Sequence, residues 1–294
     1  MNCSPENEDF IFEEREPIDE SSITMNDSDN NVLEIPPSIY FGGCACGVVF
    51  YIGVYQAMID RWGADFPQKT VIYGDSAAVI IVLAITRQLS PQYIGELYKE
   101  FGKNSPYGML SGCFPLEENI LKNLVDNFKD PSLHEKLKGR MFIGKSHFFA
   151  KHVWKNEWES LDDLYKCIVD SFNIPILCDS KNKSTNAFVD GAFIFSGKDL
   201  PDGDATLYVA DDIHADITTV FTNKEMFFVN LNEDYDRLYQ NGYNAFMAWD
   251  GKYKQKVGFR KSKYGIQCLL WVLFVIEKIG NFCCSIFRFF CKCL

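Results

Sequence analysis

The fold is decided by the stretch Val71-Ile72-Tyr73-Gly74-Asp75-Ser76-Ala77-Ala78 and by the apolar run of residues 79–89 that follows it. The first three residues are typical of a strand, and the apolar run predicts a helix that is apolar on nearly every side, as buried central helices are. The small residues Gly74 and Ala78 allow a sharp strand-to-helix turn between the two. Such a turn lifts Ser76 clear of its neighbours, at the positive end of the helix dipole. Ser76 is therefore a candidate nucleophile, and the alternative is a turn with a purely structural role.

A glycine-rich turn lies in the preceding strand–turn–helix segment of the chain. Residues 39–41 predict a short strand, the turn is Gly42-Gly43-Cys44-Ala45-Cys46-Gly47, and apolar residues at helical spacing from Val48 predict a helix. Consecutive backbone N–H groups without bulky side chains bind anions, either phosphate or the oxyanion of acyl transfer. The Gly-Lys-Ser/Thr of a phosphate-binding loop is absent from this turn, which favours the oxyanion. Glycines that only permit close packing of the helix on the strand are the alternative.

In the rest of the chain as far as residue 249, predicted strands alternate with predicted helices. Helices are predicted at residues 91–101, 116–128, 161–171 and 233–249, and strands at residues 141–143, 174–177, 187–189 and 207–210. Ser90-Pro91 has the pattern of an N-cap followed by proline at the first helical position. This alternation predicts an α/β fold, in which helices cover the faces of a sheet.

Asp190-Gly191-Ala192 directly follows the strand predicted at residues 187–189. By itself, Asp-Gly after a strand predicts no more than a turn. The order of glycine loop, Gly-x-Ser-x-small turn and Asp-Gly, however, resembles the pattern of the patatin-like phospholipases. Further segments are similar to that family and to its adiponutrin-like branch; they are Ser171-Phe172-Asn173-Ile174-Pro175, Leu207-Tyr208-Val209-Ala210 with Asp216-Ile217, and Asn241-Gly242-Tyr243-Asn244-Ala245. The resemblance covers roughly residues 38–250.

The resemblance implies a three-layer α/β/α sandwich with a central, mostly parallel sheet. It also implies a serine lipid acyl hydrolase that cleaves acyl esters of phospholipids or glycerolipids without a metal or a cofactor. Ser76 would be the nucleophile, Asp190 its base, and the backbone N–H groups of Gly43, Cys44 and Ala45 the oxyanion hole. A weakly nucleophilic hydroxyl needs such a base and such an anion site. An acyl-enzyme would form on the serine and would be released by water, or by another alcohol in a transacylation.

Two alternatives stay open. The chain has Cys44 and Ala45 where the family's glycine loop has a further glycine, and Asp75 places a carboxylate beside the nucleophile, where a negative charge opposes an oxyanion unless it is paired or solvated. A catalytically impaired protein that binds lipid at a membrane is therefore the competing prediction. A Ser-Asp-His triad is the mechanistic rival, and His214 is the only one of the four histidines that follows Asp190.

The formal net charge of −11 is an average over three unlike segments. Residues 1–37 carry eleven acidic residues and one basic one, whereas residues 252–294 carry nine basic residues and one acidic one. The acidic arm lacks an apolar run, so we expect it to be disordered, and its acidic start is unlike a secretory signal. Residues 38–251 form the predicted hydrolase domain. Because this domain is acidic, we expect no binding to nucleic acid.

The third segment, residues 252–294, is basic, apolar and rich in cysteine. Its first apolar run is shorter than the ~20 residues that span a bilayer, and a span that uses both runs would place Glu277-Lys278 near mid-membrane. We therefore expect a helix in the membrane interface, or a hairpin that dips into it, at the cytoplasmic face of a membrane or on a lipid droplet. Basic residues from Lys252 to Lys263 would face anionic lipid. An ordinary helix packed on the body is the alternative.

The cysteines divide in the same way. Candidate lipidation sites lie in the tail, where neighbouring cysteines suit palmitoylation and the last four residues have the position of an atypical prenylation box; they are Cys283, Cys284, Cys291 and Cys293. The body cysteines Cys113, Cys167 and Cys178 are expected to be buried thiols in a reducing compartment.

Overall fold

The computed structural model describes residues 33–103, 121–124, 130–147, 151–172, 188–193, 195, 197–219 and 230–256. All the helices and strands below belong to one unit, residues 34–294. Several predictions fall outside the described residues: the arm as far as residue 32, the strand at 174–177, most of the helix at 116–128, Cys113 and Cys178, and the chain beyond residue 256 with its four candidate lipidation cysteines. Residues 121–124 of that predicted helix are helical.

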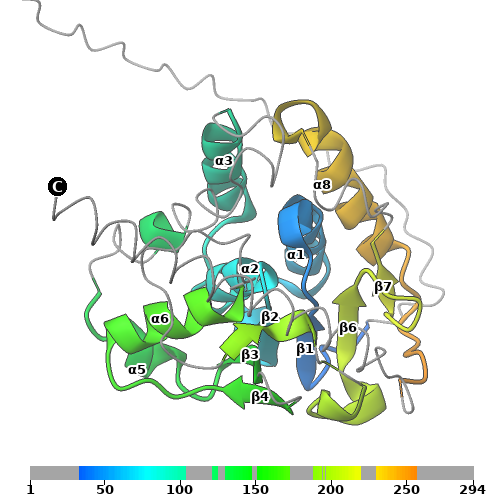
Figure 1. The fold of residues 1–294 in the computed structure, drawn as a ribbon. Helices are drawn as coiled ribbons and strands as arrows, with labels where there is room; N and C mark the ends of the chain where they lie inside the picture. The colour runs from blue at the N-terminus through cyan, green and yellow to red at the C-terminus, as the bar shows by residue number, and fades with distance from the viewer. Residues whose placement is uncertain are drawn as a thin grey trace, which may run out of the picture. The chain divides into compact units, whose positions relative to one another are not determined.

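Within the described residues, one seven-stranded sheet forms the centre of the domain (Figure 1). The strand order is β4-β3-β2-β1-β6-β7, and β5 also pairs with β3. All neighbouring pairs are parallel except β3 with β4 and β3 with β5, which are antiparallel. The strands are β1 (Ser38–Phe41), β2 (Val71–Asp75), β3 (Met141–His147), β4 (Lys151–Lys155), β5 (Phe188–Asp190), β6 (Leu207–Ala210) and β7 (Ile217–Thr218).

Helices flank this sheet, and the arrangement is consistent with a three-layer α/β/α sandwich, so the predicted fold class is confirmed. The helices are α1 (Val48–Trp62), α2 (Ala78–Thr86), α3 (Pro91–Gly102), α5 (Leu133–Leu137), α6 (Leu161–Ser171) and α8 (Leu231–Met247). Short 3-10 helices are η2 (Ala45–Gly47), η3 (Phe66–Gln68), η5 (Gly191–Phe193), η6 (Gly197–Asp199) and η7 (Gly203–Ala205).

Local signals account for several of these elements. All nine residues of α2 are buried, as its continuous apolar sequence predicts. The N-terminus of α3 follows the predicted cap, because the Ser90 hydroxyl accepts the backbone N–H of Tyr93 at 3.2 Å. Ser160 caps α6 in the same way and accepts the backbone N–H of Asp163 at 3.1 Å.

Helices α1 and α8 cross at very short range through two glycines. A Cβ atom on Gly53 of α1 would lie 2.0 Å from the carbonyl oxygen of Tyr239, and one on Gly242 of α8 would lie 1.9 Å from the carbonyl oxygen of Phe50. Since real Cβ atoms do not come within 3.0 Å of such atoms, only glycine fits at these two positions without a shift of the helices.

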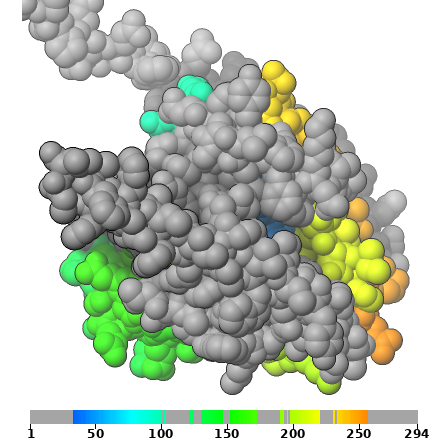
Figure 2. Space-filling view, in the orientation of Figure 1, coloured from blue at the N-terminus to red at the C-terminus, as the bar shows by residue number. Residues whose placement is uncertain are grey.

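The last described residues dock onto the β6–β7 side of the domain, and Figure 2 shows residues 200–219 and 250–256 side by side at the surface. The Lys256 ammonium lies 2.9 Å from the Asp216 carboxylate, and both side chains are buried. The Lys256 backbone N–H also donates to Asp204 at 2.7 Å. Lys256 was expected to face anionic lipid; its burial in this ion pair shows that prediction to be wrong for this residue, whereas Lys252 and Lys254 are exposed.

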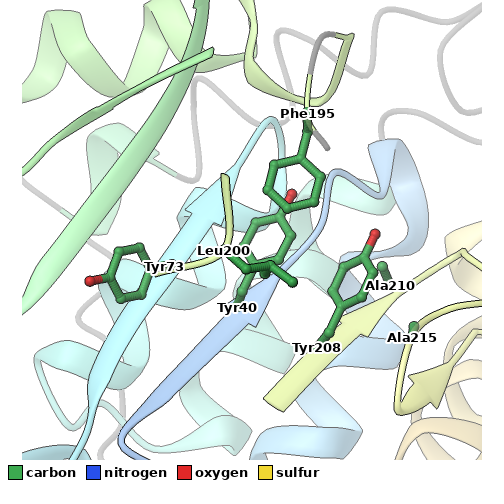
Figure 3. Packing of buried hydrophobic residues seen from close by; sticks show 7 residues of the cluster. All are labelled: Tyr40, Tyr73, Phe195, Leu200, Tyr208, Ala210 and Ala215. Carbon is green, nitrogen blue, oxygen red and sulfur yellow. The ribbon is translucent and has the colours of Figure 1, made fainter. Parts of the chain in front are cut away.

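The two faces of the sheet differ in character. Neighbouring strands place aromatic side chains in register on one face, where Tyr40 pairs with both Tyr73 and Tyr208 (Figure 3). Phe195 and Leu200 cover this aromatic cluster. The other face carries mainly aliphatic residues and packs on α2, and Tyr51 of α1 contacts Phe41 of β1.

The structure adds elements that the sequence did not predict. Strand β4 has a basic, mixed sequence and forms the outer antiparallel partner of β3, and β7 is only two residues long. Strand β2 also continues through Gly74 and Asp75, which were assigned to the turn, because both residues pair with β3. The turn itself is therefore confined to Ser76 and Ala77.

Strands β2 and β5 occupy the same edge of β3, one after the other. Asp75 at the end of β2 pairs with Gly144, and Asp190 at the end of β5 pairs with the next residue, Lys145. β2 runs parallel to β3 and β5 antiparallel to it, so the ends of the two strands meet. This meeting brings residues 76 and 190 together although 114 residues separate them.

Candidate active site

Ser76 sits at the sharp turn between β2 and α2, with a φ of +54°. A non-glycine residue with positive φ is uncommon, and such strain is characteristic of functional turns. The backbone N–H of Val79 donates to the Ser76 carbonyl at 3.1 Å, which ties the turn to the first turn of α2. The predicted elbow residues support this geometry: Gly74 packs directly beneath Val82 of α2, and Ala78 begins the helix.

The Ser76 hydroxyl donates a hydrogen bond of 2.5 Å to the Asp190 carboxylate. The second oxygen of Asp190 accepts the backbone N–H of Ala192 at 2.9 Å, which fixes the orientation of the carboxylate. Ser76 is 7% exposed and Asp190 is 3% exposed. The structure therefore brings together the two residues that were predicted to act as nucleophile and base, in a largely dehydrated setting where a hydrogen bond to a carboxylate is strong.

Ser171, at the end of α6, supports the elbow and was not among the predicted site residues. Its hydroxyl accepts the backbone N–H of Ser76 at 3.0 Å and donates to the Gly144 carbonyl at 2.6 Å. One side chain thus joins α6, β3 and the elbow. Its only sequence signal was its place in a segment that resembles one of the patatin-like phospholipases. A buried serine at a helix end also needs tertiary partners, which the sequence does not identify.

The glycine loop lies directly against the elbow. A Cβ on Gly43 would stand 2.9 Å from Cβ of Ser76 and 2.6 Å from Cβ of Ala192, so only glycine fits there. Ala45 has a φ of +46°, which turns the loop into η2. Within the described part of the chain, the backbone N–H groups of Gly43, Ala45 and Ala77 have no hydrogen-bond acceptor. Free N–H groups beside a serine hydroxyl are the donors that an oxyanion hole requires.

Cys44, the third predicted donor, lies between these loop residues and is buried. The Cys44 thiol points to the Ala45 carbonyl at 3.9 Å, and neither it nor the Cys46 thiol is in a disulfide bond in the part of the chain that the structure describes. Ala77 was not predicted as a donor; its N–H follows the nucleophile directly at the start of α2, where backbone donors have no intrahelical partner.

Asp75, the carboxylate that precedes the nucleophile, is fully buried on the aromatic face. It accepts a 2.6 Å hydrogen bond from the Tyr40 hydroxyl, and the Nε2 atom of His152 lies 3.8 Å from the same oxygen. Burial, and next the Asp75 charge, hold the pKa of Tyr40 well above its ordinary value, so Tyr40 remains a donor. The carboxylate before Ser76 is therefore hydrogen-bonded to Tyr40, and His152 faces the same oxygen without a hydrogen bond to it.

A buried ion pair joins β3 to α6 near the site. The Lys145 ammonium lies 3.6 Å from the Asp170 carboxylate, and each side chain is less than a tenth exposed. Lys145 is also directly opposite Asp190 in the β3–β5 pairing, which puts both side chains on one face of the sheet. Nearby Cys167 is a buried free thiol, as predicted, and burial raises its pKa.

His214, the rival base, lies on the loop after β6, and its backbone N–H donates to Asp212 at 2.8 Å. The Ser76 hydroxyl donates directly to a carboxylate, which is the arrangement of a dyad. In the residues that the structure describes, no group of three or more His, Cys, Asp or Glu side chains could hold a metal ion.

No protein-family model and no curated protein matches this chain.

Within residues 33–256, as far as they are described, no helix is both long enough and apolar enough to cross a membrane.

Proposed function

We propose that the protein is a serine lipid acyl hydrolase that uses Ser76 and Asp190 as a catalytic dyad. The observation that carries this proposal is the 2.5 Å hydrogen bond between the two side chains at a strained elbow. The N–H groups of Gly43, Ala45 and Ala77, which have no acceptor among the described residues, support it, because Gly43 lies against Ser76, Ala45 belongs to the same loop as Gly43, and Ala77 directly follows Ser76. The similarity of several segments to patatin-like phospholipases is the basis for lipid esters as the substrate class.

In the proposed reaction, the Ser76 oxygen attacks the ester carbonyl carbon while Asp190 accepts the hydroxyl proton. The negative charge that develops on the carbonyl oxygen is stabilised by the loop N–H groups. The carbon–oxygen bond to the alcohol then breaks, and the alcohol takes the proton from Asp190. Water, deprotonated by Asp190 in turn, attacks the acyl-enzyme and releases the fatty acid, which restores the serine.

We also propose that the basic, apolar C-terminal segment holds the domain at a cytoplasmic membrane face or a lipid droplet. The buried Lys256–Asp216 ion pair fixes the start of this segment to the domain. Exposed lysines at positions 252 and 254 precede the basic residues beyond 256, and each such charge near anionic lipid contributes about 1 kcal/mol. Flotation of the full chain with anionic vesicles tests this proposal; equal flotation of a chain truncated after Gly265 would contradict it.

The test of the enzyme is turnover of a panel of acyl esters by the full chain, compared with Ser76→Ala and Asp190→Asn. We expect both substitutions to lower kcat by about a thousandfold or more, because each removes a member of a unit that acts together. Labelling with a fluorophosphonate probe gives a readout that does not depend on the substrate. Equal turnover and equal absence of labelling in all three proteins would instead favour the lipid-binding protein without activity.

A further inference from the structure

The buried carboxylate beside the nucleophile is a problem for an enzyme of the proposed kind. Asp75 has no exposed surface, and its Oδ1 atom lies 3.4 Å from the position of a Cβ on Gly43, a loop residue proposed to bind the oxyanion. This oxygen has no hydrogen-bond partner among the residues that the structure describes. An ionised carboxylate at this place would oppose the negative charge that forms during acyl transfer.

The backbone lies close around the Asp75 side chain, which no bulk solvent reaches. A Cβ on Gly191 would lie 2.5 Å from Cβ of Asp75, and one on Gly144 would lie 3.0 Å from it. The side chain is thus enclosed by the backbone of β3, of the Asp-Gly turn and of the glycine loop. A carboxylate in such a place needs polar partners, because bulk solvent cannot screen its charge.

His152 is a candidate for such a partner. Its side chain on β4 is 1% exposed and its Nε2 atom is 3.8 Å from Asp75. The ring is held edge-on by Trp154, at 4.5 Å between ring centroids, and by Phe195, at 5.4 Å. These contacts fix the imidazole over Gly144, where a Cβ would lie 2.6 Å from Nε2. The position of His152 is therefore as well determined as that of the carboxylate.

We propose that His152 is a positioning residue whose imidazole faces the Asp75 carboxylate and, together with the Tyr40 hydroxyl, offsets its charge, so that the glycine loop can stabilise the oxyanion at Ser76. This inference rests on the proposed hydrolase activity. It assigns a role to three side chains outside the dyad. It also explains how an acidic residue can precede the nucleophile in a working enzyme.

The test is a double-mutant cycle in the full chain, read as kcat and KM on the best ester of the panel. His152→Gln should lower kcat at least tenfold, equivalent to about 1.4 kcal/mol, with KM changed less than about threefold. Adding Asp75→Asn to this variant should restore kcat to within about threefold of the wild type, because the unpaired charge is then gone. His134→Gln, the same change on α5, is the control and should leave both constants unchanged.

Tyr40→Phe provides a second route to the same result, since it keeps the ring and removes only the hydroxyl that donates to Asp75. It should lower kcat severalfold, and Asp75→Asn should restore the activity here also. Thermal unfolding of each variant confirms that it is folded. Wild-type kcat in His152→Gln, or a loss that Asp75→Asn does not repair, would overturn the proposal while Ser76-dependent turnover still stands. Wild-type protein without Ser76-dependent turnover or labelling would overturn the proposed function and this inference together.

Discussion

The crossing of α1 and α8 leads to a prediction in which two physical effects have opposite signs. Gly242→Ala replaces a helical glycine with the best helix former, and helix propensity alone would stabilise the protein by about 1 kcal/mol. The added Cβ, however, would lie 1.9 Å from the carbonyl oxygen of Phe50. Because that oxygen is backbone, it cannot rotate away, and the two helices must separate by roughly an ångström to reach an allowed contact.

Separating the two helices lowers the free energy of unfolding by an amount that depends on how tightly their side chains pack. Overpacking strain is about 1–3 kcal/mol, and the side chains between the helices also lose dispersion contacts when the gap opens. Phe246 of α8, which is fully buried, contacts Trp62 of α1 at 5.0 Å between ring centroids. We therefore expect a net destabilisation of about 2 kcal/mol, or a decrease of about 4–8 °C in the unfolding temperature.

Equilibrium urea denaturation, followed by tryptophan fluorescence, measures this free energy of unfolding. Asn244→Ala on the exposed side of α8 is the matched control, and its effect should stay within about 0.5 kcal/mol. A Gly242→Ala protein as stable as the wild type, or more stable, would refute the reasoning, because helix propensity would then outweigh the close contact.

Three further predictions concern the site, the docked segment and pH. Ser171→Ala removes the acceptor of the Ser76 N–H, so we expect a loss of about 1–3 kcal/mol in urea denaturation and slower fluorophosphonate labelling; an unchanged labelling rate would contradict a role at the elbow. Lys256→Met leaves the Asp216 carboxylate buried without its partner and should destabilise by about 3–5 kcal/mol in the same assay, with recovery when Asp216→Asn is added. Burial raises the pKa of Tyr73 from 10.0 to about 12, so this phenol stabilises the fold below pH 10, and that stability is lost as the pH rises towards 12. Tyrosinate absorbance and circular dichroism should therefore change together in this range, and ionisation of all tyrosines without loss of structure would contradict the prediction.

The elements that could be predicted are those whose signals are local. The apolar run of α2 and the Ser90-Pro91 start of α3 specify their structure within a few residues. Strand β4 could not be predicted, because Lys151–Lys155 becomes a strand by pairing with the edge of β3 rather than by its own composition. The same holds for β7, whose two residues contain no periodicity to detect.

The residues of the candidate site likewise fall into two groups, those with a local sequence signal and those placed by strand pairing. Ser76 and Asp190 could be predicted because each belongs to a short motif in a characteristic order. Tyr40 and His152 could not, since they reach Asp75 only through the lateral register of β1 and β4 in the sheet. Register depends on pairing between distant segments, which a single sequence does not reveal.

Under the proposed function, the meeting of β2 and β5 on one edge of β3 makes the reactivity of Ser76 depend on the register of β5. β5 has three residues, and a slip of one residue along β3 would move Asp190 by about 3.3 Å and turn its side chain to the opposite face of the sheet. A chain with that slip would keep its helices and most of its sheet, and would lose the hydrogen bond between Ser76 and Asp190. The fraction of molecules that react with an active-site probe therefore counts the molecules in which two segments 114 residues apart have paired in the correct register.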